Sequence, residues 1–144
     1  RGRGDSLAGD ARGDAHAPPD CRPLPVCGEV TWCADAAPLW QAHCHCESCR
    51  RATSAAFASF LGVAEGSFVW TGRPPATFAS SPGVWRDFCP RCGSPMADRV
   101  ARFPGGVHLY AATLIDPTGY APSVHVHTAK RLPWVHLADG LAQE

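Results

Sequence analysis

Short segments in which apolar and polar residues alternate run through most of the chain after residue 20. A period of two places every second side chain on the same face of a β-strand, so this pattern predicts half-buried strands. The segments that show it are residues 29–34, 39–43, 55–63, 68–71, 76–80, 84–88, 96–100, 107–113 and 125–128. Helix is expected only in short turns, after Cys49, at 64–67 and at 116–120.

Turn-forming residues separate these segments. Gly, Pro, Asp and Ser gather at 71–75, 81–83, 103–106 and 116–119, where they supply the backbone conformations of tight turns. Many short strands joined by regular turns are typical of an all-β domain. The chain has 144 residues, 45% of them hydrophobic, which suffices for one modest core. We therefore expect a single, mainly β domain over residues 21–144.

The first twenty residues differ in composition from the rest. They are rich in Gly, Asp, Arg, Ala and Pro, with one Leu and no aromatic residue, so they bury too little surface to offset the entropy of ordering. We predict a flexible tail over residues 1–20. It holds no apolar run typical of a signal peptide, and no segment approaches the roughly 20 apolar residues of a membrane span. A cytoplasmic protein is expected.

The charge of the chain is balanced. Thirteen Lys and Arg residues face thirteen Asp and Glu residues, so nothing in the overall charge attracts the protein to a phosphate backbone or an anionic membrane. Nucleic acid and membrane are therefore not expected as partners. The sequence carries no signal for a particular oligomeric state.

Eight cysteines are the most informative feature of the composition. Such a number indicates either a secreted disulfide scaffold or metal sites. Five of them lie in the motifs C-x-C-x-x-C, at Cys44, Cys46 and Cys49, and C-x-x-C, at Cys89 and Cys92. Neighbours two or three residues apart are better placed to share a metal ion than to form unstrained disulfides. The spacing favours metal.

The C-x-C-x-x-C motif indicates a catalytic rather than a structural metal. Three thiolates leave one position of a tetrahedral zinc ion open, as in catalytic zinc sites. We expect Cys44, Cys46 and Cys49 to hold zinc and the open position to take substrate.

The second motif, Cys-Pro-Arg-Cys-Gly at 89–93, is typical of a zinc knuckle. The two-residue gap lets both sulfurs reach one metal, and the Gly permits a left-handed turn. A closed structural site needs four ligands. Cys27, followed by Gly28, is expected to be the third, and the fourth is Cys21 or Cys33. We prefer Cys21, because Cys33 lies inside a predicted strand, where a buried thiol is expected.

These motifs together resemble a known family. They are Cys-Gly-Glu-Val at 27–30, Cys-His-Cys-Glu-Ser-Cys-Arg-Arg at 44–51, Phe-Ala-Ser-Phe-Leu-Gly-Val at 57–63, Phe-Cys-Pro-Arg-Cys-Gly-Ser-Pro at 88–95 and Arg-Leu-Pro-Trp at 131–134. In this order and spacing the chain resembles the glutathione-dependent formaldehyde-activating enzyme family, which includes centromere protein V. The resemblance covers residue 21 to the C-terminus.

The resemblance implies a β-tent fold that carries two zinc ions. It assigns Cys44, Cys46 and Cys49 to the catalytic ion, and Cys27, Cys89 and Cys92 to the structural ion, together with a Cys two positions before Cys27. That position is Pro25 in this chain. Either Cys21 replaces the missing ligand through a looped-out segment 22–26, or the structural site has three ligands; we favour Cys21.

The reaction that the resemblance implies is the addition of glutathione to formaldehyde to give S-hydroxymethylglutathione, the chemistry of a carbon–sulfur lyase. Two alternatives stay open. The chain is an enzyme of the same fold acting on another small thiol or electrophile, or a zinc-stabilised binding module without catalysis. The open three-cysteine site favours an enzyme.

Other residues near the motifs have weaker functional interpretations. His45 lies between two predicted ligands and is a candidate for a hydrogen bond behind them or for a proton relay. Arg50 and Arg51 are candidates for binding the carboxylates of glutathione, or they are solvated surface charges. His125 and His127 share a face of their predicted strand and either approach the pocket or pack elsewhere. The five Trp residues are expected in the core.

Overall fold

The computed structural model describes residues 26–144. The predicted tail at 1–20 and the predicted ligand Cys21 lie outside the described residues. Within them the chain forms ten strands: β1 Trp32–Ala34, β2 Trp40–Cys44, β3 Ala58–Ala64, β4 Phe68–Trp70, β5 Ala76–Ser81, β6 Val84–Phe88, β7 Pro95–Val100, β8 Gly106–Tyr110, β9 Val124–Val126 and β10 Ala142–Gln143.

One α-helix, α1 Glu47–Thr53, follows β2. Short 3₁₀ helices lie at Glu65–Ser67, Ala111–Thr113, Pro117–Gly119 and Thr128–Lys130. No helix in the described part of the chain is long and apolar enough to cross a membrane.

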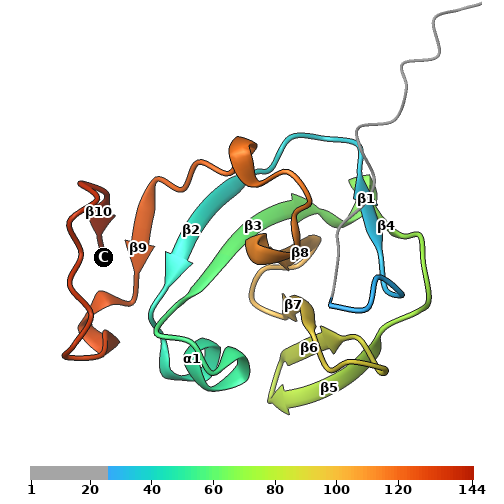
Figure 1. Ribbon diagram of the computed structural model, residues 1–144, viewed down its shortest axis with the longest axis horizontal. Helices are drawn as coiled ribbons and strands as arrows, with labels where there is room; N and C mark the ends of the chain where they lie inside the picture. Colours follow the sequence, from blue (N-terminus) through green and yellow to red (C-terminus); the bar gives the residue numbers. More distant parts are fainter. Residues whose placement is uncertain (1–25) are drawn as a thin grey trace, which may run out of the picture.

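Eight strands form one sheet in the order β10-β9-β2-β3-β8-β7-β6-β5, and β1 and β4 form a separate antiparallel pair. The large sheet is antiparallel except at one edge, where β9 runs parallel to both β2 and β10. Figure 1 shows that the sheet is strongly curved, with β9, β2 and β3 in one wing and β5, β6 and β7 in the other. Register shifts between β5, β6 and β7 contribute to the bend, because a β-bulge increases local twist.

The two faces of the sheet carry different cores, as the alternation of β3 shows. Leu61 and Val63 point to the larger core, which β1, β4 and the 89–93 turn cover. Phe60 points to the opposite face, where it packs with Tyr110, Ala58 and the cysteines of the C-x-C-x-x-C motif. The strand β3 is thus apolar on both sides, because both of its faces are buried.

The mainly β fold with short helical turns is confirmed. Most of the expected strands are present with boundaries moved by a few residues. Three details are wrong. The first strand begins at Trp32 rather than at residue 29, residues 111–113 form a 3₁₀ helix, and the short strand β10 has no alternating pattern to reveal it. The domain limits 21–144 and the cytoplasmic location stay predictions.

Candidate active site

The C-x-C-x-x-C motif spans the junction between β2 and α1. Cys44 is the last residue of β2, Cys46 is the N-cap of α1, and Cys49 lies in its first turn. The expected helical turn after Cys49 therefore begins earlier, at Glu47. The backbone N–H of Cys49 donates a hydrogen bond to Cys46 Sγ over 3.3 Å, so a sulfur caps the helix where an oxygen usually does. The three sulfurs lie within 4.8 Å of one another.

The close approach of these sulfurs changes their acidity. Hydrogen bonds from Cys44 and Cys49 hold the pKa of Cys46 far below its ordinary value, to about 2. Its thiolate in turn raises the pKa of Cys44 to about 11, and contacts with Cys44 and Cys46 raise that of Cys49 further. The first proton leaves readily, whereas three adjacent thiolates repel one another. A soft cation bound to all three sulfurs removes this conflict.

The three cysteines line a groove of about 1470 Å³. This exceeds the usual volume of a small-molecule site, about 300–1,000 Å³. Most of the lining is apolar or aromatic, with Trp40, Phe60 and Phe103 around the ring of His108. Trp40 and His108 meet edge to face with their ring centroids 4.8 Å apart. The groove thus offers an apolar floor beside a cluster of sulfurs.

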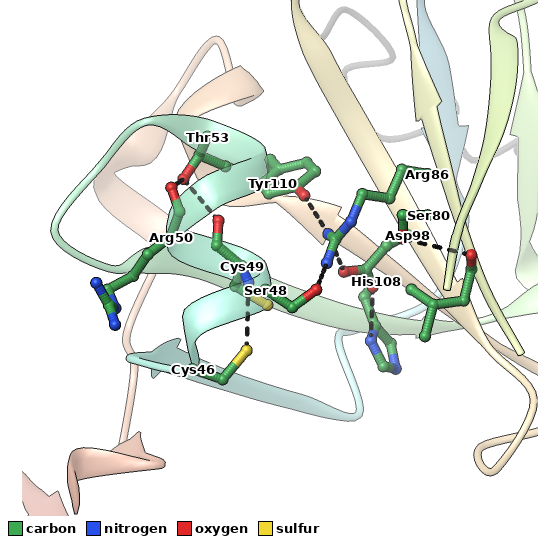
Figure 2. A network of polar contacts seen from close by, with 11 residues as sticks. Cys46, Ser48, Cys49, Arg50, Thr53, Ser80, Arg86, Asp98, His108 and Tyr110 are labelled. Carbon is green, nitrogen blue, oxygen red and sulfur yellow. Dashed lines mark hydrogen bonds and ion pairs between the residues drawn. The ribbon is translucent and has the colours of Figure 1, made fainter. Parts of the chain in front are cut away.

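One arginine connects the helix of this site to the opposite wing of the sheet (Figure 2). Arg86 Nη2 donates to Ser48 Oγ on α1 over 2.9 Å, while Nη1 donates to Asp98 Oδ2 on β7 and to Tyr110 Oη on β8. Burial lowers the pKa of Arg86, but Tyr110 and Asp98 outweigh it, so the net shift is upward and the guanidinium stays charged. Arg86 also interacts with Cys49, which places a permanent positive charge beside the sulfurs.

The partners of Arg86 are buried polar groups. Asp98 is 3% exposed, and its other carboxylate oxygen lies 2.9 Å from His108 Nδ1. Burial raises the pKa of Tyr110, so this phenol remains a neutral donor and acceptor. No local motif in the sequence marks these four residues, because Arg86, Asp98, His108 and Tyr110 come from three different strands.

A second cysteine cluster packs against the larger core. Cys27, Cys89 and Cys92 bring their sulfurs within 4.8 Å of one another, and Cys27 Sγ is 3.5 Å from Cys89 Sγ. The predicted left-handed turn is present at Gly93, whose φ is 76° and whose N–H donates to the carbonyl of Cys89. A hydrogen bond from Ser94 lowers the pKa of Cys92 to about 6.

The acidity of Cys27 reflects opposing effects. A backbone hydrogen bond from Glu29 lowers its pKa, but desolvation and contacts with Cys92 and Cys89 outweigh it and raise the pKa. The Glu29 side chain accepts hydrogen bonds from Arg73 and Arg91, so ion pairs connect the segment of Cys27 to the turn that carries Cys89 and Cys92. The three sulfurs of this cluster are thus held close enough to share one metal ion.

No fourth cysteine joins this cluster among the described residues. Cys21, the predicted ligand, lies outside them and stays a prediction. Cys33, the other candidate, is in β1 opposite Val69 and is disulfide-bonded, so the expectation of a free buried thiol there is wrong.

The histidines lie on different sides of the sheet. His45 is fully buried, and its Nε2 lies 2.9 Å from His125 Nδ1; its Nδ1 has no hydrogen-bond partner in the described structure. His127 has a φ of 58° and lines the groove, because β9 ends at Val126 and the backbone turns. The expectation that His125 and His127 share a strand face is therefore wrong.

Arg50 and Arg51 do not line the groove. Arg50 Nε donates to the carbonyl of His45, and Arg51 pairs with Glu47 on the surface of α1. The arginines that line the groove are Arg86 and Arg102. Of the five tryptophans Trp32 is buried, whereas Trp40 forms part of the groove and is 40% exposed; Trp85 and Trp134 are also exposed. The expectation that all lie in the core is wrong.

Both cysteine clusters fit zinc. Each brings three sulfurs within 4.8 Å of one another, with backbone or hydroxyl donors next to them. Thiolate sulfur is the ligand type that zinc prefers in tetrahedral sites. The cluster of Cys44, Cys46 and Cys49 opens to a groove, whereas Cys27, Cys89 and Cys92 pack against the larger core.

Fold and site together define a class: a small, mainly β domain with two cysteine clusters that fit a metal ion, one of which opens into a groove. The chain belongs to the glutathione-dependent formaldehyde-activating enzyme family, whose model matches residues 21–130. Among solved structures it is similar to the crystal structure of a Rhodobacter sphaeroides protein, with a TM-score of 0.55 and 18% identity over 70% of this chain and 91% of that chain. At this identity the likeness shows a shared fold. No curated protein matches the chain significantly.

Proposed function

We propose that the chain is a zinc-dependent enzyme of the carbon–sulfur lyase type, which adds glutathione to formaldehyde or a similar small aldehyde. The observation that carries this proposal is the convergence of Cys44, Cys46 and Cys49 in the wall of a groove, in a member of this family. A structural zinc site is closed by four protein ligands, whereas a catalytic site keeps one position open to a ligand cavity.

In the proposed reaction the sulfur of glutathione bonds to the aldehyde carbon, the carbonyl π electrons move to oxygen, and the thiol proton ends on that oxygen. Cys44, Cys46 and Cys49 would hold the zinc ion, whose open position would lower the pKa of a bound thiol or polarise the carbonyl oxygen of the aldehyde.

The residues of the chain supply the positioning and the surrounding charge. Arg86 stays protonated next to Cys49 and offsets negative charge that collects at the sulfurs. Its hydrogen bonds to Ser48 and Tyr110 fix α1, and with it Cys49, relative to the opposite wing. The apolar lining beside the sulfurs offers few polar groups to screen these charges, which strengthens their electrostatic interactions.

For the second cluster we propose a structural zinc, which gives two ions per chain. Cys27, Cys89 and Cys92 are three of its ligands, and Cys21 is the fourth in this proposal. Because Cys33 is disulfide-bonded and Cys21 is the one other cysteine outside the two clusters, zinc and that disulfide compete for Cys21. A Cys21→Ser variant tests the assignment: zinc bound at this cluster should weaken about tenfold or more if Cys21 is a ligand. Unchanged zinc affinity supports a site with three protein ligands instead.

Exchange NMR on formaldehyde and glutathione at equilibrium tests the reaction. Zinc-loaded wild-type protein should accelerate the exchange between free formaldehyde and S-hydroxymethylglutathione, and Cys46→Ser should not. Ala37→Ser, which introduces a serine at an exposed position outside both clusters, serves as the matched control. Because formaldehyde and thiols combine spontaneously, the comparison includes buffer alone. If the zinc-loaded wild type accelerates nothing, the glutathione assignment is wrong.

The lining of the groove favours a second candidate, an enzyme of the same fold that acts on a thiol or aldehyde with an apolar group. Glutathione is highly polar, whereas Trp40, Phe60 and Phe103 form an apolar wall. Exchange measured with aromatic aldehydes or alkyl thiols separates the candidates. Specific binding of such compounds without turnover would indicate a binding module.

A further inference from the structure

Behind the groove, on the opposite face of the sheet, two histidines and an aspartate converge. His43 of β2 is in register with His125 of the neighbouring parallel strand β9, and their ring centroids are 4.8 Å apart. Asp139 comes from the C-terminal segment, which runs beside β9 in Figure 1. One ligand atom from each of the three side chains lies within 4.8 Å of the other two.

Alternation along β2 separates this group from the cysteines of the groove. Ala42 and Cys44 line the groove, so His43 between them points to the other face. His43 packs there against Phe57 and Tyr120, with ring centroids 5.0 and 5.8 Å away. The two groups of candidate ligands thus lie on opposite sides of one strand.

Each of the three side chains is already oriented by a hydrogen-bond partner on one of its polar atoms. His43 Nδ1 is 2.8 Å from Ser59 Oγ, which leaves Nε2 for another partner. Asp139 Oδ1 accepts a hydrogen bond from the N–H of Leu141, and Oδ2 is 2.8 Å from His125 Nε2. Metal-binding histidines and carboxylates in proteins are usually oriented in this way by a partner on the atom that does not bind the metal.

His125 has the same arrangement. It is 1% exposed, and its Nδ1 is 2.9 Å from His45 Nε2, so its ring orientation is fixed. The 2.8 Å between His125 Nε2 and Asp139 Oδ2 is shorter than the roughly 3.0–3.4 Å between two ligands that each bind one ion at about 2.0–2.2 Å, so binding requires a small outward shift of the half-exposed Asp139. The side chain of Asp139 is 45% exposed, which gives an ion access from solvent.

We propose that His43, His125 and Asp139 form a further metal site, separate from both cysteine clusters, for a divalent first-row transition metal such as Zn²⁺ or Fe²⁺. Two imidazoles and one carboxylate suit such ions, and three ligands leave positions for water or a small ligand. Binding replaces the proton between His125 Nε2 and Asp139. The ion connects the C-terminal segment to β2 and β9.

Equilibrium dialysis at fixed free Zn²⁺, with zinc counted per chain by elemental analysis, tests the site. The wild type should hold one zinc ion more than Asp139→Asn and His43→Gln, whose affinity at this site should fall about tenfold or more. His136→Ala is the matched control, because His136 is an exposed histidine of the same C-terminal segment. It should hold as much zinc as the wild type.

Cobalt identifies which site has lost its ion. In Co²⁺-loaded protein the difference spectrum between wild type and Asp139→Asn should contain weak d–d bands without sulfur-to-cobalt charge transfer. A charge-transfer band in that difference, or equal zinc in wild type and both variants, would overturn the proposal. Long-range ¹H–¹⁵N NMR on the wild type needs no variant. The ring nitrogens of His43 and His125 should shift on loading, and unchanged shifts would contradict the site.

Discussion

The Arg86–Asp98 pair gives the sharpest test of how the site is held. The side chains are 12% and 4% exposed, and the guanidinium also donates to Ser48 and Tyr110. Replacing Arg86 with Met leaves the carboxylate of Asp98 buried without its cation. Breaking a buried pair from one side costs about 3–5 kcal/mol. At a urea dependence of about 1.5 kcal/mol/M, the unfolding midpoint should fall by about 2–3 M.

A double-mutant cycle separates the pair from the packing around it. The variant Arg86→Met/Asp98→Leu removes both charges, so it should recover at least half of the loss and give a coupling energy of about 2 kcal/mol or more. Urea unfolding of the four zinc-loaded proteins, followed by circular dichroism, measures each free energy of unfolding. Arg51→Met, which breaks the exposed pair with Glu47, should cost less than about 0.5 kcal/mol. Additive losses in the cycle would refute the reasoning.

Three further predictions concern the metal, the groove and the ion pairs of the N-terminal segment. Adding a zinc chelator should lower the melting temperature sharply or unfold the protein, because structural zinc contributes on the order of 10 kcal/mol to the folding free energy of small domains. An unchanged melting temperature with both clusters empty would contradict a structural role. Gly62→Ala should lower the free energy of unfolding by about 1–3 kcal/mol and displace Trp40, because the new Cβ would lie 2.1 Å from its ring. Gly66→Ala is the control in fluorescence and ligand titrations, because no atom lies within 4 Å of its new Cβ. Unchanged Trp40 emission in Gly62→Ala would count against this clash. Hydrogen bonds from Arg91 and Arg73 lower the pKa of Glu29, so these pairs stabilise the fold above the ordinary pKa of about 4.3 and lose their effect as the pH falls through the lowered value. The melting temperature of Glu29→Gln should lie below that of the wild type at pH 7, and the difference should shrink in acid. A difference that does not change with pH would show that the charge of Glu29 plays no part.

The local parts of this structure follow from the sequence. Cys44, Cys46 and Cys49 are close in the chain, so their spacing alone brings their sulfurs together, and the same holds for Cys89 and Cys92. Strands with strict alternation were predicted with small errors at their ends. These features depend on backbone periodicity and on the short reach of neighbouring residues, which a sequence states directly.

The contacts between distant segments were not predictable in the same way. Arg86 meets Ser48 across 38 residues, and His45 meets His125 across 80. Their position follows from the order of strands and from the curvature of the sheet, neither of which leaves a local pattern. Trp40 was assigned to the core from its hydrophobicity, but a groove for ligands needs apolar walls as well, so residue type alone cannot separate the two.

The turn between β7 and β8 has a consequence for how this protein can change. Phe103 on that turn is 54% exposed and contributes to the groove, yet the turn carries none of the cysteines. The cysteines of the groove belong to the β2–α1 junction, more than fifty residues earlier in the chain. Substitutions or grafted loops at residues 101–106 can therefore alter which compounds enter the groove while Cys44, Cys46 and Cys49 remain in place. The turn that shapes the groove can therefore vary independently of the three cysteines, and a library of variants confined to residues 101–106 is a direct way to search for new ligands.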